Sequence, residues 1–516
     1  MKKILSFVSA RTTLIFTWIF AVMAPWLFYV CRLGHVYIDI VLFDGFCTTV
    51  FFIMAISAVF VSILAFIRIR SNKYKDTNEL PAWLNVCNAV FFVLTFLFTV
   101  VWIASLSVMG KESSPVAFRT LLPTLFTGFA IIVGAFFALF FPAIKPRKIR
   151  AGIAAVVIVA LFFGIIGSLY PLSVYKIISD PMVIDTGKDY SVVFATNTSG
   201  TGYISYEYEG KSYLVYDETD GRKVNSRIHS VSVPYEHLDG NVYSVGSTRV
   251  IDELSYGGTN GRTVESKEYA FRSDKTTGAE KKYLCVSDWH THNDLAKKTA
   301  FLHSGYDGII LLGDALPGLQ FEEEAAEYIV SFGGELSGGT LPVYYVRGNH
   351  ETRGAYATSL SERLGLDGFY YVTETDEYRF VILDSAEDKA DDHPEYGGMT
   401  DYSAHRAEMV EWLEGLAPSE KPTAVFSHDL KICLEEDLQK RAFEKIESLN
   451  AVLMVSGHTH TSELRKEGEL DVLIDGGHDK GKFVATSLTF GADGLEVLSW
   501  DEAGNVTVSH TFLYAE

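Results

Sequence analysis

The first third of the chain contains five long apolar stretches that few charged residues interrupt. Each is long enough to cross a hydrocarbon core of roughly 30 Å as a helix, so the sequence predicts a bundle of transmembrane helices over residues 1–171. Lys2 and Lys3 precede the first stretch as in a signal peptide, but its apolar run is long and four more follow, so we expect it to stay attached. The expected spans are 12–30, 48–67, 86–108, 121–141 and 153–169.

Basic residues in the short loops predict the orientation of these helices. The N-terminus and the second and fourth loops together hold 11 Lys and Arg residues, whereas the first and third loops hold 3. Cytoplasmic loops collect positive charge, so we expect a cytoplasmic N-terminus, and five crossings place everything after Pro171 outside the cytoplasm, at the cell surface or on the periplasmic side. Asp39 and Asp44 lie near an expected interface, where water can solvate them, so anchoring in the lipid bilayer is favoured over transport.

Charge is divided unevenly between the two parts of the chain. Up to Pro171 there are 14 Lys and Arg against 5 Asp and Glu, and the remainder has 30 against 59. So acidic a remainder repels phosphate backbones, which argues against nucleic acid as a partner unless bound cations reverse the field locally.

Residues 176–273 form short runs of alternating polarity, separated by Gly, Asn and Asp. Six or seven such runs in about a hundred residues predict an antiparallel β-sandwich. The stretch 233–243, VPYEHLDGNVY, resembles the fibronectin type III signature, in which a Leu and a following Tyr hold a corner between two strands. A polar linker over 272–282 marks the expected end of this domain. The expected strands are 190–195, 202–208, 212–216, 228–233, 241–245 and 265–271.

The last domain repeats one arrangement five times. A short apolar run, typical of a buried central strand, ends in a residue type that binds hard or borderline metals. A single strand-terminal His or Asp is usually just solvated, but five in one domain make independent solvated ends improbable. The runs are 283–287 before Asp288 and His290, 308–313 before Asp314, 343–348 before Asn349, His350 and Glu351, 423–427 before His428, and 451–457 before His458 and His460.

Helical patterns lie between most of these runs, at 322–332, 358–364, 404–416 and 434–449. Strands that alternate with helices imply a layered α/β fold, in which sites lie beyond the carboxyl ends of the strands. All five endings should therefore gather at one place. After them, 495–499 and 506–512 predict a hairpin that closes the second sheet.

Spacing and glycine support a metal site at this place. Two residues that are two positions apart on an extended chain point the same way, as in the pairs Asp288 with His290 and His458 with His460. Glycine stands directly before Asp314, before Asn349 and before His458. It allows a sharp turn and a close approach of the backbone to an ion.

Taken in order, DxH, GD, GNH followed by an acid, H and GHxH, these motifs resemble the calcineurin-like metallophosphoesterase superfamily over residues 281–516. The resemblance implies an α/β four-layer sandwich and a binuclear metal centre. It further implies that Asp288, His290 and His460 bind one metal, that Asn349, His428 and His458 bind the second, and that Asp314 bridges them. His350 would lie beside the substrate as a catalytic residue, oriented by Glu351.

The chemistry of this ligand set is consistent with the resemblance. Two cations a few ångströms apart can hold a hydroxide that attacks phosphorus and can neutralise the phosphate oxygens. Oxygen and imidazole ligands without thiolate favour Mn, Fe or Zn, without choosing among them. A protonated His350 could stabilise the transition state or protonate the leaving oxygen.

A sandwich before this fold is also similar to the purple acid phosphatases, but two motifs differ from that family. Its tyrosine ligand would fall at Pro317 of this sequence, and the family lacks the histidine that stands here at His290. We therefore expect no tyrosinate-to-iron colour.

The sequence thus predicts a multi-domain chain: an α-helical transmembrane region over 1–171, a fibronectin III-like β-sandwich over 176–273 and a phosphoesterase domain over 281–516. The leading function is hydrolysis of a phosphomonoester or phosphodiester by a membrane-anchored enzyme. The alternatives are a lipid-linked phosphate or pyrophosphate hydrolase, an inert binding ectodomain, and transport by the helical bundle with a regulatory ectodomain. Eight loop residues could shape substrate binding or be ordinary loop residues: His292, Asp294, Arg353, Asp384, Glu387, Asp391, Asp392 and His393.

Overall fold

The computed structural model describes residues 175–254, 257–275, 280–375, 377–476 and 482–514. The chain divides into two compact units, Met1–Ser173 and Val174–Glu516, and all described residues belong to the second. Within the described ranges no helix is long and apolar enough to cross a membrane. The five predicted spans lie outside these ranges, and the transmembrane bundle stays a prediction.

Two large sheets organise the second unit, one of 13 strands and one of 6. The main path of the first sheet runs through β21 (Val506–Leu513), β20 (Gly494–Asp501), β19 (Val484–Phe490), β10 (Lys281–Val286), β11 (Gly308–Leu311), β12 (Pro342–Tyr345), β1 (Met182–Asp185), β2 (Tyr190–Tyr208), β7 (Val242–Leu254) and β8 (Gly257–Glu265). The second sheet runs through β13 (Tyr371–Glu374), β14 (Arg379–Ile382), β15 (Thr423–Phe426), β16 (Ala451–Ser456), β18 (Leu470–Asp475) and β17 (Ser462–Glu467).

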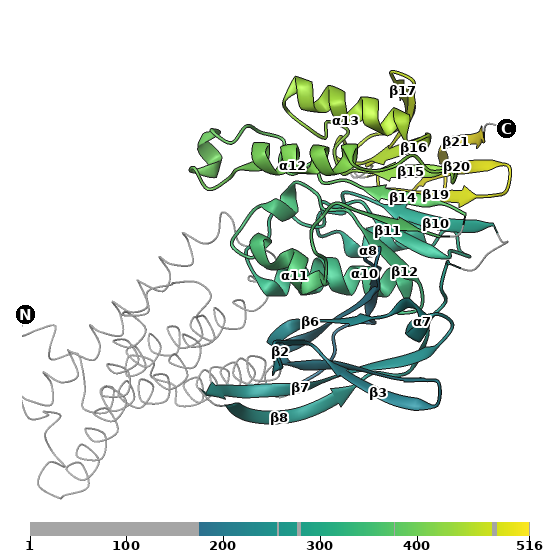
Figure 1. Ribbon diagram of the computed structural model, residues 1–516. Helices are drawn as coiled ribbons and strands as arrows, with labels where there is room; N and C mark the ends of the chain where they lie inside the picture. Colours follow the sequence, from purple (N-terminus) through teal and green to yellow (C-terminus); the bar gives the residue numbers. More distant parts are fainter. Residues whose placement is uncertain (1–174, 255–256, 276–279, 376, 477–481, 515–516) are drawn as a thin grey trace, which may run out of the picture. The chain divides into compact units, whose positions relative to one another are not determined.

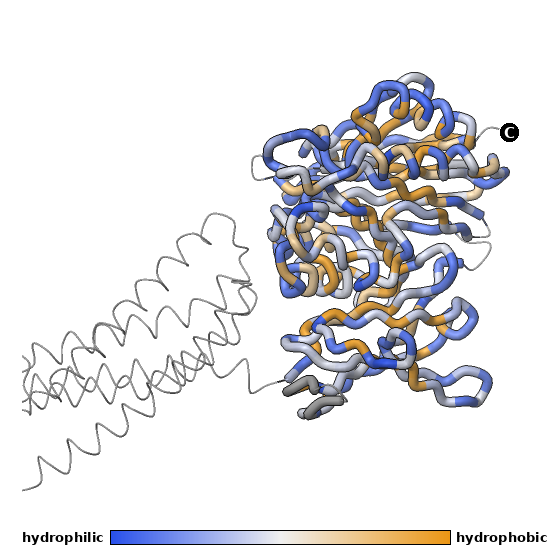
Figure 2. Tube along the Cα trace, turned by 60° about the vertical axis from the view of Figure 1, so that its left-hand side comes forward, coloured by the Kyte–Doolittle hydropathy of each residue, from blue (hydrophilic) through white to orange (hydrophobic). Residues whose placement is uncertain are grey.

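Helices cover the outer face of the six-stranded sheet and that of the central strands of the 13-stranded sheet (Figure 1). One core lies between the sheets and includes Tyr283, Tyr344, Phe380 and Phe426. A second core fills the space between the six-stranded sheet and the helices α12 (Tyr402–Glu414) and α13 (Glu436–Ser448). Figure 2 shows hydrophobic residues following the strands inside the unit. The predicted α/β four-layer arrangement is confirmed.

The central strands are parallel, as their composition predicts. β11, β12 and β15 are buried along their whole length, which requires cover on both faces of the sheet. β10 pairs in parallel with β11, and β11 with β12, in the first sheet, while β14, β15 and β16 are parallel neighbours in the second. Their carboxyl ends therefore lie at the same end of the sheets.

The four helical patterns are also confirmed. The first is a composite of α9 (Glu322–Ala325), a π-helical turn η3 (Ala326–Val330) and α10 (Ser331–Ser337). The others are α11 (Leu360–Leu364), α12 and α13. The remaining helical segments are α7 (Tyr235–Leu238), α8 (Asn293–Ala300), η4 (His350–Thr352), η5 (Ala357–Ser359) and η6 (Pro394–Tyr396).

The middle segment forms antiparallel strands, but they continue the first sheet. β1 pairs in parallel with β12, and β2 runs antiparallel to β1. The expected strands 190–195 and 202–208 are one strand, β2, with an irregularity between Ala195 and Gly200. The other strands of this segment are β3 (Lys211–Tyr216), β4 (Glu218–Thr219), β5 (Arg222–Lys223), β6 (Asn225–Val233), β7, β8 and β9 (Tyr269–Ala270).

Tyr243 differs from the expected fibronectin type III corner. Its hydroxyl donates a hydrogen bond of 2.7 Å to the carbonyl of Gly339, just before β12. A corner tyrosine would instead bond the backbone a few residues upstream in its own sandwich. Tyr243 thus ties the middle segment to the following domain, and the resemblance to fibronectin type III gains no support.

The C-terminal hairpin is present as β20 and β21, which are antiparallel neighbours. Its assignment to the second sheet was wrong, because β19 joins it to β10 in the 13-stranded sheet. Alternating polarity predicts a strand with one buried face, but it does not identify the strand that pairs with it. The hairpin was therefore predicted, and its sheet was not.

Glu322 provides a test of the link between the middle segment and the following domain. Its Oε1 accepts hydrogen bonds from the backbone N–H groups of Arg227 (2.7 Å) and Ile228 (3.0 Å) and from the Ser226 hydroxyl. Replacement by Ala removes the acceptor, so Glu322→Ala should destabilise the unit by about 1–3 kcal/mol. Glu322→Gln keeps one oxygen and should lose less. The urea midpoint measures both, and an unchanged midpoint in the Ala variant would contradict the proposed tie.

Candidate metal centre

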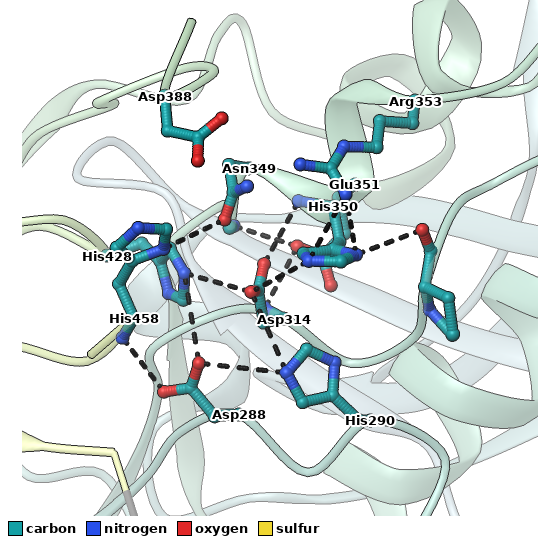
Figure 3. Close-up of polar contacts among 12 residues, drawn as sticks. Asp288, His290, Asp314, Asn349, His350, Glu351, Arg353, Asp388, His428 and His458 are labelled. Atoms are coloured by element: carbon teal, nitrogen blue, oxygen red, sulfur yellow. Dashed lines mark hydrogen bonds and ion pairs between the residues drawn. The ribbon is translucent and has the colours of Figure 1, made fainter. Parts of the chain in front are cut away.

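Five strand ends deliver the predicted site residues to one place (Figure 3). Asp288 and His290 follow β10, Asp314 follows β11, Asn349 and His350 follow β12, His428 follows β15, and His458 and His460 follow β16. The side chains form three overlapping groups able to hold a metal ion: Asp288, His290 and His460; His290, Asp314 and His350; Asp314, His428 and His458.

The first group has its ligand atoms close together. His460 Nε2 lies 3.2 Å from Asp288 Oδ1 and 3.1 Å from His290 Nε2. Asp288 is fully buried, and a buried carboxylate between two imidazoles suits a divalent cation.

The group of Asp314, His428 and His458 is built around a carboxylate that is also buried. His428 Nε2 lies 3.2 Å from Asp314 Oδ2, and Asn349 Oδ1 lies 3.2 Å from His458 Nδ1. Asp314 Oδ2 is also 3.9 Å from His290 Nε2 of the first group. Asp314 belongs to two of the three groups, the one with His290 and His350 and the one with His428 and His458. The bridging role that the resemblance implies for it stays a prediction.

The two buried carboxylates shift the titration of their neighbours. Burial alone would raise the pKa of Asp314, but His428 and then His350 hold it well below its usual range. Burial would lower the pKa of His428, but Asp314 and Asp288 raise it to about 10. Burial lowers the pKa of His290 to about 4. Positive charge is therefore drawn to His428, and a cation in this place would take over the role of that proton.

In metal-binding histidines the ring nitrogen that faces away from the metal usually donates to a carbonyl or carboxylate. His428 and His458 have such partners. His428 Nδ1 lies 2.7 Å from the Leu312 carbonyl, which can only accept, so Nδ1 carries the hydrogen and Nε2 is left for a ligand. His458 turns Nδ1 to the site, and its Nε2 lies 3.7 Å from an oxygen of Asp429. Asp429 was not among the predicted residues, although its place directly after His428 marked it as a neighbour of the site.

Two buried oxygens test whether a cation fits. Asp288 Oδ1 accepts no hydrogen bond of good geometry from any described residue. Asn349 Oδ1 lies 3.2 Å from the acceptor atoms of His458, His428 and Asp314, and a turned amide would instead place its nitrogen there. A cation would give the buried Asp288 Oδ1 the partner it lacks, and Asn349 could add its oxygen in the orientation that faces the histidines, so the oxygen and imidazole donors fit divalent metal.

The backbone at these loops is left-handed. φ is 52° at Asp288, 37° at His290, 57° at Asp314, 66° at His458 and 55° at His460. The predicted reason for the convergence of each DxH or HxH pair, alternation on an extended chain, was therefore wrong. The side chains converge because the chain turns sharply at each residue, at a cost of order 1–3 kcal/mol each.

Glycine serves a close approach at all three predicted positions, and a Cβ at Gly313 would lie 2.3 Å from the backbone nitrogen of Gly348. A Cβ at Gly348 would overlap the Asp314 backbone and carboxylate, and one at Gly457 would overlap Ser287 and the Asp288 carboxylate. Glycine is required at these positions because each one lies in van der Waals contact with another loop of the site.

Glu351 has a different role from the predicted one. Its buried carboxylate accepts hydrogen bonds from the N–H groups of Asp314 (3.0 Å), Ala315 (2.5 Å) and Gly348 (2.9 Å). Burial and Asp314 raise the pKa of Glu351 to about 7. It therefore fixes the loop that carries Asp314, and the orienting contact of His350 is with another residue.

His350 is oriented by a backbone carbonyl. Its Nδ1 lies 2.9 Å from the oxygen of Pro317, so that nitrogen donates and Nε2 faces the site, 3.7 Å from Asp314 Oδ2. Pro317 is the position at which the purple acid phosphatases would have a tyrosine ligand.

The comparison with protein families agrees with this geometry. Residues 281–462 match the family described as Calcineurin-like phosphoesterase. These residues form a calcineurin-like phosphoesterase domain. The predicted enzyme class is confirmed: the domain is a hydrolase that acts on phosphoester bonds. No curated protein sequence matches the chain.

Solved structures give weaker likenesses. The GAP50 anchor in the inner membrane complex of Plasmodium is 11% identical, with 46% of this chain and 90% of that chain covered and a TM-score of 0.34. The phosphopantetheinyl hydrolase of Mycobacterium tuberculosis is 17% identical, with 39% and 90% covered and a TM-score of 0.27. A predicted phosphoesterase of Streptococcus pneumoniae is 13% identical, with 46% and 100% covered and a TM-score of 0.24.

Of the eight loop residues that could shape substrate binding, some lie at the site and others only stabilise the fold. His292 precedes α8, His393 caps η6, Asp391 caps α12, and both Asp294 and Asp392 are exposed. Arg353 and Glu387 do reach the site of the phosphoesterase domain, because the two side chains pair beside His350. Asp388, which was not predicted, lies near Asn349 at the rim (Figure 3).

Asp384 is structural. It is fully buried, bonds Arg347 through both side-chain oxygens and lies 2.7 Å from His405 Nε2. Burial alone would raise the pKa of Asp384, but Arg347 and then His405 hold it well below its usual range. This cluster fixes the segment that leads from β12 to Asn349.

The cluster predicts a pH-dependent stability. A depressed carboxyl pKa stabilises the fold at all pH values above the unfolded pKa of about 4, and the contribution is lost as pH falls through the folded value. Asp384→Asn should cost about 3 kcal/mol at pH 7, because it leaves a buried cation unpaired, and the difference from wild type should shrink below about pH 4. Urea unfolding followed by fluorescence measures it. Asp294→Asn, on a fully exposed side chain, is the matched control. A difference that persists unchanged at pH 3 would contradict the assignment.

Proposed function

We propose that this chain is a membrane-anchored phosphoesterase that hydrolyses phosphomonoesters or phosphodiesters with two divalent metal ions. The observation that carries the proposal is the convergence of seven oxygen and imidazole donors, among them the carboxylate of Asp314, which two of the groups share. When bound, two such cations activate the attacking water and neutralise charge on the phosphate oxygens. The residues that would hold them are Asp288, His290, Asp314, Asn349, His428, His458 and His460.

The charge of the donor set suits an anionic substrate. The set contains two carboxylates, four imidazoles and one amide, and hence a charge of −2 when the imidazoles are neutral. Two divalent cations would leave the site with about two net positive charges. This local excess attracts a phosphate ester although the chain as a whole has a net charge of −20.

His350 supplies a proton donor beside this charge. The Pro317 carbonyl fixes its Nδ1, so its Nε2 points to the substrate side and, when protonated, can donate to the leaving-group oxygen. The ring is partly exposed, with 25% of the side chain accessible, so substrate can reach it.

The first test is metal content and hydrolysis of p-nitrophenyl phosphate and bis-p-nitrophenyl phosphate by the full-length chain with Mn, Zn or Fe. Asp314→Asn removes the charge of the carboxylate that two of the groups share. It should lower the bound metal below two ions per chain and turnover by about 1000-fold, since such metals contribute several kcal/mol. Asp471→Asn, on a side chain paired with Lys466 in the β17–β18 hairpin, is the matched control and should retain both.

Three outcomes separate the alternatives. Metal-dependent turnover that Asp314→Asn abolishes supports the proposal. Two bound metals without turnover of either ester would favour a lipid-linked phosphate or pyrophosphate as substrate. Absence of bound metal would contradict the mechanism and favour an inert binding ectodomain.

Membrane anchoring is supported by the five apolar stretches and by the 11 basic residues in alternate loops. The proposed topology has the N-terminus in the cytoplasm and the phosphoesterase domain outside it. A reporter enzyme that is active only outside the cytoplasm, fused after Glu516, should be active. The same reporter fused within the loop that follows residue 67 should be inactive. Activity of the second fusion and inactivity of the first would reverse the orientation.

A further inference from the structure

Arg353 brings a guanidinium group next to His350. It follows the short η4 helix that carries His350. Its Nη1 lies 3.1 Å from Nδ1 and 3.2 Å from Nε2 of His350, so the guanidinium lies against the imidazole (Figure 3). Because His350 Nδ1 already donates to Pro317, this contact is a packing of two planar groups.

Glu387 holds the guanidinium in this position. Its Oε1 pairs with Arg353 Nε and its Oε2 lies 3.1 Å from Nη2, which is the two-point pairing that fixes an arginine most firmly. The N–H of Asp388 and the hydroxyl of Tyr396 also donate to Glu387 Oε2. Burial alone would raise the pKa of Glu387, but Arg353 lowers it to about 2, so the pair is ionised at neutral pH.

The guanidinium has N–H groups to spare. Of its five, the pair with Glu387 uses two, and the Nη1 edge beside His350 remains. The Asn349 amide lies 2.8 Å from Arg353 Nη2 and, turned with its oxygen toward the guanidinium, accepts from it. The N–H groups of Nη1, beside His350, remain for another acceptor. An anionic oxygen beside Arg353, Asn349 and His350 would satisfy them.

We propose that this oxygen belongs to the substrate, and that Arg353 selects phosphomonoesters over phosphodiesters. The inference rests on the proposed function. A monoester has three non-bridging oxygens, of which two could be neutralised by bound metal ions while the third could accept from Arg353. In a diester that oxygen carries a second organic group. It cannot then accept a charge-assisted hydrogen bond, and it meets the rigid Arg353–Glu387 pair.

The test compares two esters in the Mn-loaded full-length chain. Arg353→Ala should lower kcat/KM for p-nitrophenyl phosphate by about 100-fold, the size of loss for one charged donor, and should change that for bis-p-nitrophenyl phosphate by less than about 5-fold. Arg353→Lys should recover only part of the loss, because an ammonium cannot pair with Glu387 at two points. Glu387→Gln, which acts through Arg353, should also lower the ratio of kcat/KM for the monoester to kcat/KM for the diester, by a smaller factor.

Arg441→Ala is the matched control. Arg441 pairs with Glu414 at two points, at 2.8 and 2.7 Å, between α12 and α13 on the surface. The ratio of the two esters should be unchanged in this variant. Metal content should equal that of wild type in all four.

Binding gives a reading that does not depend on turnover. Calorimetry with the Mn-loaded chain should show inorganic phosphate binding more tightly than dimethyl phosphate, and Arg353→Ala should weaken phosphate by about 10-fold or more without weakening dimethyl phosphate. A wild-type preference for the diester, an equal loss for both esters, or unchanged phosphate binding in the variant would overturn the inference. Failure of the proposed function is distinct: wild type would then bind no metal or hydrolyse neither ester.

Discussion

The fold around the site depends on burying two carboxylates, Asp288 and Asp314, where few protein donors reach them. Both are within 1% of complete burial, and one oxygen of Asp288 accepts no hydrogen bond of good geometry from the described residues. A buried anion is tolerated only if positive charge accompanies it. His428 can supply part of that charge, and metal ions supply it fully. The same unmet demand makes the site suited to bind divalent metal ions.

The loops that bring these carboxylates together have a strained backbone, and hydrogen bonds from neighbouring loops stabilise them. Five site residues adopt left-handed φ values, and Gly348 and Gly457 lie where a side chain would collide with a neighbouring loop. Glu351 compensates by accepting three backbone hydrogen bonds that hold the Asp314 loop in place. Strain of this kind persists only where the surrounding structure over-determines it, and here each strained loop begins at the end of a buried parallel strand, β10, β11 or β16.

Local pattern was sufficient for the parts of the fold that repeat. Buried β-branched and aromatic runs identified β10, β11, β12, β15 and β16, and the residue after each run identified the candidate ligands. What failed depended on contacts between distant segments. Neither the pairing of β1 with β12 nor the bond from Tyr243 to Gly339 has a local signal. The role of Glu351 was misassigned for the same reason: its neighbour in sequence is His350, but its partners are backbone groups of another loop.

Two scales of charge meet at this site. The whole chain is acidic, with a net charge of −20, and such a field disfavours phosphate esters at a distance. Within the site the field is set by nearer groups, since screening limits exposed charges to about 8–10 Å at physiological ionic strength. The Arg353–Glu387 pair is nearly neutral as a unit and adds little attraction. The pair can affect binding only through the position and orientation of the Arg353 N–H groups, which Glu387 holds in place. Specificity can therefore reside in Arg353 even though metal ions would provide most of the affinity.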